Sequence, residues 1–348
     1  MHVQDVFVHP AGQDDNLGDS ALRDGLLRAL RGNGARLHVH LEGQTSDYLP
    51  GVPLRSDEAF YPERRAWLAA SDMAAHPVYV VNAGEINPQP EMPFPHARRA
   101  GEMRRVTNRG GIVIAAGLGL KNPAIASRVV FDSALRDAAV MSWRDAESQA
   151  AAGFGGVAPD WAFALGSDPS IWATAEDRPL IAITLRFDRP WPTDDWIAEL
   201  RGLAVRTDRR IVTVAQVARD APRAVLLAER LGGEYLVAAS TRHDDLDKHV
   251  RAVYARSLVV VSDRAHALIM GATEGAYPLG TAADPQKIQR LLDAAGVGAL
   301  TGHHDGLASR ASQLEAVLPD LQRAVRQARR DLRGLTERIH AAMDAAAG

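Results

Sequence analysis

Cysteine is absent from the 348-residue sequence. Its absence excludes disulfide bonds, cysteine-ligated zinc sites and thiol nucleophiles. The chain also lacks a run of about 18 consecutive apolar residues, the length that a membrane-spanning helix needs. The first residues show no basic segment followed by an apolar one, so we expect no signal peptide. Together these absences are typical of a cytoplasmic protein, and we expect that location.

The sequence also lacks an excess of either positive or negative charge. Lys and Arg number 40, Asp and Glu number 43, and the formal net charge is −3. Such a balance gives no general attraction to nucleic acid, so we expect no nucleic-acid partner. The arginine-rich C-terminal tail is a local exception. It either packs across the rest of the protein or makes peripheral contact with the inner membrane surface.

Apolar runs of strand length alternate with amphipathic helical segments, which is the pattern of βαβ units and a parallel sheet. The alternation occurs in two series, interrupted between Gly166 and Pro179 by turn-forming residues. We therefore predict an α/β fold with two Rossmann-like domains facing across a cleft. The predicted domains are residues 1–168 and 175–305, and residues 306–348 form a helical tail. Ligands of open α/β sheets bind beyond the carboxyl ends of the strands, so the cleft is the expected site.

The segment Asn16-Leu17-Gly18-Asp19 lies between the first predicted strand and the first predicted helix. Gly18 allows a close turn, and Asp19 or Ser20 can cap the helix. The N-terminus of that helix attracts anions. Asp19 can alternatively accept a hydrogen bond or a proton from a sugar hydroxyl.

A glycine pair, Gly117 and Gly119, is predicted to form a loop after a middle strand. Two glycines in this setting are a weak signal for phosphate binding. The third glycine of a dinucleotide fingerprint is missing, and no acidic residue stands at the expected distance. We therefore expect no nicotinamide cofactor, and no other cofactor.

Arg144 and Asp145 follow a predicted strand and begin a helix. Asp145 can cap that helix. A guanidinium group at the carboxyl end of a strand suits a carboxylate or a phosphate, because it donates two parallel hydrogen bonds. Arg144 is thus a candidate for anion binding, and the alternative for this segment is that Asp145 simply caps the helix and pairs with an arginine.

Arg264 and His266 stand at the end of a buried apolar strand, where a helix begins. They combine a fixed cation with a group that donates a proton near neutral pH. A core histidine is the ordinary alternative. Lys287 belongs to a later helix, where a solvated lysine is the usual case. The other histidines lack clear partner carboxylates, so we expect no metal site.

Taken in order, these segments resemble the polysaccharide pyruvyl transferase family over about the first 300 residues. The family pattern appears here as Asn16-Leu17-Gly18-Asp19, Gly117-Leu118-Gly119, Arg144-Asp145-Ala146-Glu147-Ser148, Asp160-Trp161-Ala162-Phe163, Leu185-Arg186, Arg264-Ala265-His266-Ala267 and Lys287. Ala265 stands where the family usually has leucine.

The resemblance implies a GT-B-like fold and a transferase that uses phosphoenolpyruvate to make pyruvate ketals on sugars of a bacterial cell-surface polysaccharide, in the cell wall or an exopolysaccharide. It implies donor binding by Arg144, Arg264, Ala265 and His266. We add Lys287 and Arg186 as cations for the donor, with Asn16, Gly18, Gly117 and Gly119 as loop contacts. We expect His266 to act as the general acid or to hold the phosphate as it leaves, and Asp19 or Asp145 to orient the acceptor hydroxyl.

Two other functions remain open for the same two-domain cleft. A glycosyltransferase that uses a nucleotide sugar would also need a cleft arginine and a lysine for the diphosphate. A sugar-binding homologue without catalysis would keep the fold and lose the reaction.

Overall fold

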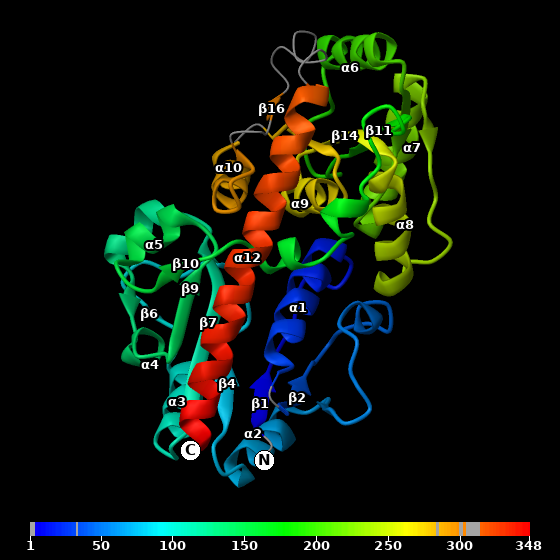
Figure 1. Cartoon of the computed structure of the whole chain (residues 1–348). Coiled ribbons are helices and arrows are strands. Elements are labelled where there is room, and N and C mark those ends of the chain that lie inside the picture. Colours follow the sequence, from blue (N-terminus) through cyan, green and yellow to red (C-terminus); the bar gives the residue numbers. More distant parts are fainter. Residues whose placement is uncertain (1–3, 33, 283–284, 299–301, 304–313) are drawn as a thin grey trace.

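The computed structural model describes residues 4–32, 34–282, 285–298, 302–303 and 314–348 (Figure 1). These residues form two parallel β-sheets that lie one above the other, as the two series of elements predict. The last strand of the first sheet is β10 (Gly156–Val157), and the first of the second sheet is β11 (Leu180–Thr184). The chain therefore passes between the sheets in residues 158–179, an interval that contains the segment from Gly166 to Pro179 in which we predict the domain boundary. The exact bounds of the domains stay a prediction.

The first sheet is parallel throughout its described pairs. Its order is β10, β9 (Val140–Trp143), β7 (Ile112–Leu120), β4 (Val78–Val80), β1 (Asp5–Val8), β2 (Arg36–His40) and β3 (Ala59–Tyr61), with β5 (Gly84–Ile86) pairing with β7. Its helices are α1 (Leu17–Leu30), α2 (Arg64–Met73), α3 (Ala97–Thr107), α4 (Ser133–Arg136) and α5 (Ala146–Ala152). A separate two-stranded pair joins β6 (Pro93–Phe94) to β8 (Val130–Phe131).

The second sheet has the strand order of a doubly wound fold, in which the order reverses beside the first strand. The order is β13 (Glu234–Tyr235), β12 (Arg210–Thr213), β11, β14 (Ser257–Ser262), β15 (Tyr277–Gly280) and β16 (Gly302–His303). Its helices are α6 (Asp194–Thr207), α7 (Ala221–Leu231), α8 (His243–Ala255), α9 (Ala265–Thr273) and α10 (Gln286–Asp293). All six residues of β14 are buried, as expected for a strand that is covered on both faces.

Short 3-10 helices complete the chain at η1 (Leu49–Gly51), η2 (Pro123–Arg128), η3 (Trp161–Ala164), η4 (Pro169–Ile171) and η5 (Ala218–Asp220). The first helix departs from the sequence prediction at its start. It begins at Leu17, and the side chain of Asn16 accepts a hydrogen bond from the backbone N–H of Gly18. The predicted caps Asp19 and Ser20 therefore lie inside α1, where their side chains are available for other contacts.

Residues 306–313 of the predicted tail lie outside the described residues, and the described part is one long helix, α12 (Leu314–Ala347), which runs beside both sheets and ends near the N-terminus (Figure 1). Its buried residues recur every three or four positions, at Leu321, Val325, Ala328, Leu332, Leu335, Ile339 and Met343. This is the apolar stripe of a helix packed against a core. Arg329 of α12 donates hydrogen bonds to the carbonyl oxygens of Phe163 (3.1 Å) and Ser167 (2.8 Å), in the segment between the sheets. The tail thus packs across both halves, the first of the two alternatives.

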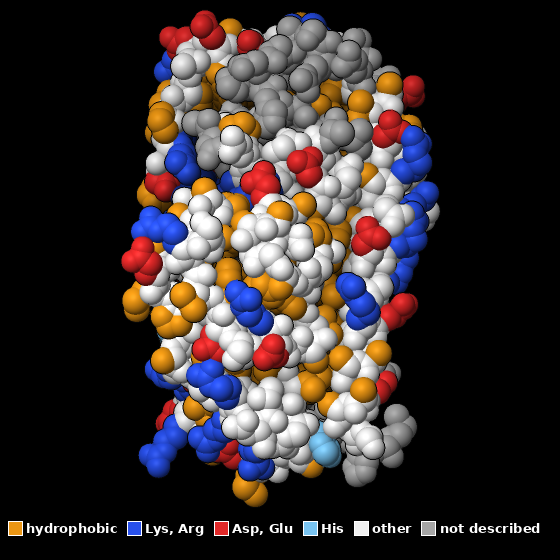
Figure 2. Space-filling model, turned by 90° about the vertical axis from the view of Figure 1, so that its left-hand side faces the viewer, with side chains coloured by type: hydrophobic (Ala, Val, Ile, Leu, Met, Phe, Trp, Pro, Cys, Tyr) orange, Lys and Arg blue, Asp and Glu red, His pale blue; other side chains and the backbone are white. Residues whose placement is uncertain are grey.

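Peripheral contact of the tail with a membrane stays a prediction. Figure 2 shows one face of the molecule, on which acidic, basic and apolar side chains are interspersed. In that view basic side chains gather along the upper part of the right-hand edge, and elsewhere the charges are mixed. No helix in the described part of the chain is both long enough and apolar enough to cross a bilayer.

Candidate functional site

A cavity of about 380 Å³ lies where the carboxyl ends of strands from both sheets meet. The first half of the chain contributes the loop after β1, the start of α1, Glu85 and Arg144. The second half contributes the segments after β11, β12 and β14, and the start of α10. We name it the cationic cavity for its basic lining residues Arg23, Arg144, Arg186, Arg189, Arg264 and Lys287.

Most of the residues that the sequence singles out lie around this one cavity. The lining includes Asn16, Asp19, Arg144, Arg186, Arg264, Ala265, His266 and Lys287. These residues are up to 271 positions apart in the chain, from Asn16 to Lys287. The fold therefore gathers them as the predicted cleft requires. Gly18, Gly117, Gly119 and Asp145 are not among its lining residues.

Asp160 is fully buried behind the cavity and contacts two of the residues that line it, Arg144 and His266. Its Oδ2 accepts a hydrogen bond from Arg144 Nη1 at 3.0 Å and lies 3.5 Å from His266 Nε2, an ion-pair distance rather than a close hydrogen bond. Its Oδ1 accepts the backbone N–H of Ala162 at 3.0 Å. Burial alone would raise the pKa of Asp160, but His266 and then Arg144 hold that pKa well below its usual range. Asp160 is therefore a carboxylate that orients both Arg144 and His266.

Asp19, near the start of α1, is a second carboxylate of the site, and both of its oxygens accept hydrogen bonds. Its Oδ1 accepts from Arg23 Nη1 at 2.9 Å, and its Oδ2 accepts from the backbone N–H of Gln13 at 2.7 Å. Burial acts to raise the pKa of Asp19, but the charges of Arg23 and His266 outweigh it and lower the pKa. Asp19 is thus ionised at neutral pH, and it lines the cavity as a hydrogen-bond acceptor.

Each predicted cation of the second half is held by a carboxylate. Arg264 Nε donates to Asp220 Oδ2 at 2.7 Å, and both side chains are largely buried. Arg186 pairs with Asp188 through two hydrogen bonds, of 2.8 and 2.7 Å.

Lys287 pairs with Glu85 across the two halves of the chain. An anion entering the cavity must therefore displace a carboxylate or use the N–H donors that these pairs leave unused.

Three buried polar atoms of lining residues lack a hydrogen-bond partner among the described residues. They are Arg23 Nε, Arg144 Nε and His266 Nε2. Unpaired buried donors are rare in proteins because each one costs about 1–3 kcal/mol. Two of them, Arg23 Nε and Arg144 Nε, are N–H donors left free for a hydrogen-bond-accepting ligand, whereas His266 Nε2 faces the carboxylate of Asp160 at 3.5 Å.

The sequence matches the family model described as polysaccharide pyruvyl transferase over residues 16–280. The chain belongs to this family. The matched segment begins at Asn16 and includes Arg144, Asp160, Arg264 and His266, while Lys287 lies beyond it. Comparison with curated proteins finds no match.

Several solved structures share the fold. A UDP-N-acetylglucosamine 2-epimerase superposes with a TM-score of 0.56 at 12% identity, covering 97% of this chain and 94% of its own. The UDP-GlcNAc 2-epimerase from Neisseria meningitidis bound to UDP-GlcNAc gives 0.53 at 10% identity, covering 93% and 94%. A variant O-GlcNAc transferase from Thermobaculum terrenum gives 0.50 at 13% identity, covering 99% and 67%. At such identities the likeness shows the fold alone, which is the predicted GT-B-like one.

The two glycines of the family's middle segment do not form the loop that we predict. Gly117 and Gly119 both lie inside β7. Gly117 has φ +92° at an irregularity in the pairing of β7 with β9, and a Cβ there would come within 2.9 Å of the Trp161 ring. A Cβ at Gly119 would lie 2.6 Å from Arg144 Nε. Both glycines therefore make room for a large neighbouring side chain, and neither lines the cavity.

Asp145 is also placed away from the cavity. Its Oδ1 accepts the backbone N–H of Ser148 at 2.7 Å, so it caps α5, and Arg290 Nη1 donates to the same oxygen at 3.1 Å. Its Oδ2 accepts the Ser148 hydroxyl at 2.7 Å. With both oxygens engaged and the side chain 3% exposed, Asp145 has the capping role that the sequence offered as its alternative.

Gly18 lies behind the cavity wall, against His266. A Cβ at Gly18 would come within 2.5 Å of His266 Cβ and 2.7 Å of His266 Nδ1. No real pair of atoms packs this closely, so Gly18→Ala must displace the imidazole. A misplacement of about 1 Å costs roughly 10²-fold in rate. We therefore expect Gly18→Ala to lower kcat by about that factor, and to cost about 1–3 kcal/mol of stability because the clash lies at the backbone end of the His266 side chain.

The matched control is Gly101→Ala in α3, because a Cβ at Gly101 meets no atom within 4 Å. Both variants are measured for kcat by phosphate release and for thermal unfolding. Equal kcat for the two proteins would show that the contact between Gly18 and His266 has no bearing on turnover.

Sequence reasoning missed several residues of the site. Asp160 stands in the family pattern without an assigned role, and its pairing with Arg144 and His266 depends on the tertiary structure. Arg23 follows Asp19 by one helical turn, a spacing that the sequence does show. Asp263 lines the cavity, and burial raises its pKa. Glu85 is recognised as a residue of the site only from its contact with Lys287 in the structure.

The described residues contain no cluster of His, Asp and Glu side chains suited to a metal ion.

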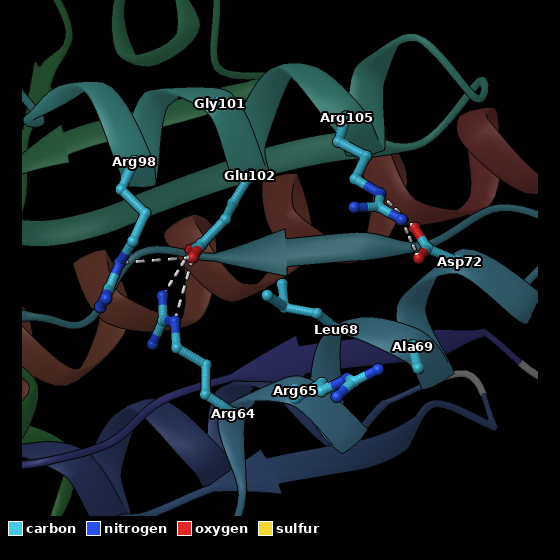
Figure 3. Close-up of a pocket in the computed structure, with 9 residues that line it drawn as sticks. All are labelled: Arg64, Arg65, Leu68, Ala69, Asp72, Arg98, Gly101, Glu102 and Arg105. Carbon is cyan, nitrogen blue, oxygen red and sulfur yellow. Dashed lines mark hydrogen bonds and ion pairs between the residues drawn. The ribbon is translucent and has the colours of Figure 1, made fainter.

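A larger hollow, of about 620 Å³, lies between α2 and α3 (Figure 3). Its carboxylates are engaged, Glu102 by Arg64 and Arg98 and Asp72 by Arg105. It is lined by Arg64, Arg65, Leu68, Ala69, Asp72, Arg98, Gly101, Glu102 and Arg105, which include none of the predicted site residues.

Proposed function

We propose that this protein transfers the pyruvyl group of phosphoenolpyruvate to a sugar of a bacterial cell-surface polysaccharide or glycolipid. The product is a pyruvate ketal, and phosphate is released. The observation that carries the proposal is the convergence of Arg144, Arg264 and His266 on one cavity. Family membership and the sugar-nucleotide proteins of the same fold support a saccharide acceptor.

Phosphoenolpyruvate carries a carboxylate and a phosphate on one small carbon frame. Fixed guanidinium groups suit both, because each donates paired hydrogen bonds to two oxygens. In the proposed complex Arg144 and Arg264 bind the donor, and Lys287 and Arg186 turn from Glu85 and Asp188 toward its phosphate. The start of α9 at Ala265 adds the partial positive charge of a helix N-terminus.

The reaction begins with a proton delivered to the methylene carbon C3, which leaves C2 electrophilic. A sugar hydroxyl oxygen then bonds to C2 and returns its proton to the imidazole of His266. The C2–O bond to phosphate breaks and phosphate leaves with the bonding electron pair. A second hydroxyl oxygen of the same sugar bonds to C2 and closes the ketal, and its proton passes to the departing phosphate. His266 is the proposed acid, Asp160 orients it, and Asp19 accepts a hydrogen bond from the attacking hydroxyl.

A comparison of polysaccharides tests this proposal in the cell, where the enzyme is expected in the cytoplasm. The polysaccharide of a strain that lacks the gene is compared by mass spectrometry with that of the parent strain. We expect the pyruvyl mass to disappear from one sugar and to return when the wild-type gene is restored. Unchanged pyruvyl content in the deletion strain would contradict the proposed function.

Restoring the gene with the His266→Gln change separates catalysis from mere binding. We expect this variant to leave the sugar without pyruvyl groups although the protein is present at normal level. Full pyruvylation with His266→Gln would instead contradict the assignment of His266 as the acid.

A further inference from the structure

A second cavity, of about 590 Å³, lies between the two halves of the chain. Its walls come from the loops after β1 and β2 in the first half, and from the ends of β12 and β13 and the starts of α7 and α8 in the second. An isolated antiparallel bridge between Asn16 and Val217 runs between the two cavities. Gln13 and Gln216 line the cationic cavity, and their neighbours Asp14 and Ala215 line the second.

The charge of the second cavity is opposite to that of the first. Its lining includes the carboxylates Asp14, Asp15 and Asp47 and, among the described residues, no lysine or arginine. His243 also lines it, but burial lowers the pKa of that imidazole, so it adds no cation at neutral pH. A phosphate or a carboxylate would therefore be repelled here.

The rest of the lining combines an aromatic ring with small apolar groups. Tyr235 is half-buried, and Val237 is 70% exposed although it stands beside the cavity. Ala215, Ala218 and Ala221 contribute further apolar surface. The rim carries hydroxyl groups, from Thr45, Ser46, Ser240 and Thr241. An apolar surface with a few well-placed polar groups is the usual composition of a small-molecule site.

The walls are held together by polar contacts across the two halves. The backbone N–H of His243 donates to the carbonyl oxygen of Asp47 at 2.9 Å, and the hydroxyl of Thr241 donates to the Asp47 carboxylate at 2.5 Å. At the other end Arg219 Nε donates to Asp15 at 2.6 Å. The cavity is thus bounded by fixed groups, and the carboxylates keep further lone pairs for a ligand.

We propose that the second cavity binds uncharged sugar units. It would serve as an accessory saccharide site for the part of the acceptor chain beyond the unit that receives the pyruvyl group, a role that rests on the proposed function. The cationic cavity and this site would then divide the two substrates by charge. The anionic donor enters one side of the bridge between Asn16 and Val217, and neutral sugar enters the other.

The chemistry of a pyranose ring matches this lining in three respects. Its C–H face is apolar and stacks on an aromatic ring such as Tyr235. Its hydroxyl groups donate to carboxylates, which Asp14 and Asp47 supply at the rim. It carries no charge, so the acidic surroundings do not oppose it.

Saturation-transfer NMR and titration on the full chain test the site, with cellotetraose, laminaritetraose and chitotetraose as neutral probes. We expect at least one probe to bind the wild type. Tyr235→Ala removes the ring, and Val237→Arg fills and crowds the cavity, so each should raise the Kd at least about tenfold. Tyr235→Phe keeps the ring and should stay within about twofold. Val205→Arg is the matched control, because Val205 is an equally exposed valine (82%) on α6.

Phosphoenolpyruvate binding is measured on the same proteins and should be the same in all of them. Failure of all three probes to bind the wild type overturns the site, and so does binding that survives both Tyr235→Ala and Val237→Arg. Displacement of the bound probe by uridine would also overturn it, in favour of a nucleoside site. Probe binding that depends on Tyr235, in a protein that does not bind phosphoenolpyruvate, supports the saccharide site and contradicts the proposed donor.

Discussion

Replacement of His266 by glutamine is expected to lower kcat by about 10²–10⁴-fold, the usual contribution of a positioned general acid. The side chain lines the cationic cavity, and its Nε2 lies 3.5 Å from the ionised Asp160. Glutamine has similar size and hydrogen-bonding capacity but cannot give up a proton. The measurement is phosphate release from phosphoenolpyruvate in the presence of the polysaccharide isolated from the deletion strain.

The control for this substitution is His96→Gln, at an exposed position before α3. We expect wild-type kcat from this control, and an affinity for phosphoenolpyruvate in His266→Gln that changes much less than kcat. A His266→Gln enzyme that turns over within a few-fold of the wild type would remove this histidine from the acid role. The cavity could then still bind the donor, with Asp263 as the next group to test.

The second large effect is on stability. Asp160→Asn removes the buried charge that faces Arg144, and both side chains are at most 6% exposed. Removal of one partner of a buried ion pair leaves the other charge uncompensated, which costs about 3–5 kcal/mol. We expect the free energy of unfolding to fall by about 3 kcal/mol, since the asparagine oxygen can still accept the backbone N–H of Ala162. Urea denaturation with the midpoint and slope fitted together gives this value.

A surface pair gives the comparison for that measurement. Asp72 pairs with Arg105, whose side chain is 58% exposed. Exposed pairs of this kind contribute about 0–1 kcal/mol, so Asp72→Asn should change stability by less than 1 kcal/mol. Equal losses in the free energy of unfolding for Asp160→Asn and Asp72→Asn would show that the contact between Asp160 and Arg144 stabilises the protein no more than a surface pair does.

The two-sheet fold is predictable from the sequence because each strand of a parallel sheet is a short buried apolar run, and both series show such runs between amphipathic segments. The location of Arg144, Arg264 and His266 is predictable for the same reason. Each lies within five residues after an apolar run, and the carboxyl ends of parallel strands meet at one edge of the sheet.

Other features of the site depend on contacts between distant segments, which the sequence does not display. A side chain at position 119 would clash with Arg144, which packs over Gly119. A side chain at position 117 would clash with Trp161 in the same way. Both resemble loop glycines in a local sequence reading. Asp145 and Asp160 have similar local settings, each before a short helix, yet Asp145 faces Arg290 and Asp160 faces His266. Only the tertiary structure distinguishes the capping carboxylate from the one in the site.

The central claim is that the cationic cavity binds phosphoenolpyruvate. Isothermal titration of the purified full chain tests it most directly, with phosphoenolpyruvate and UDP-GlcNAc as the two ligands. We predict one phosphoenolpyruvate site per chain, weakened in Arg264→Ala, and no heat of binding from UDP-GlcNAc. Saturable binding of UDP-GlcNAc by a chain that does not bind phosphoenolpyruvate would contradict the claim and indicate a nucleotide-sugar enzyme.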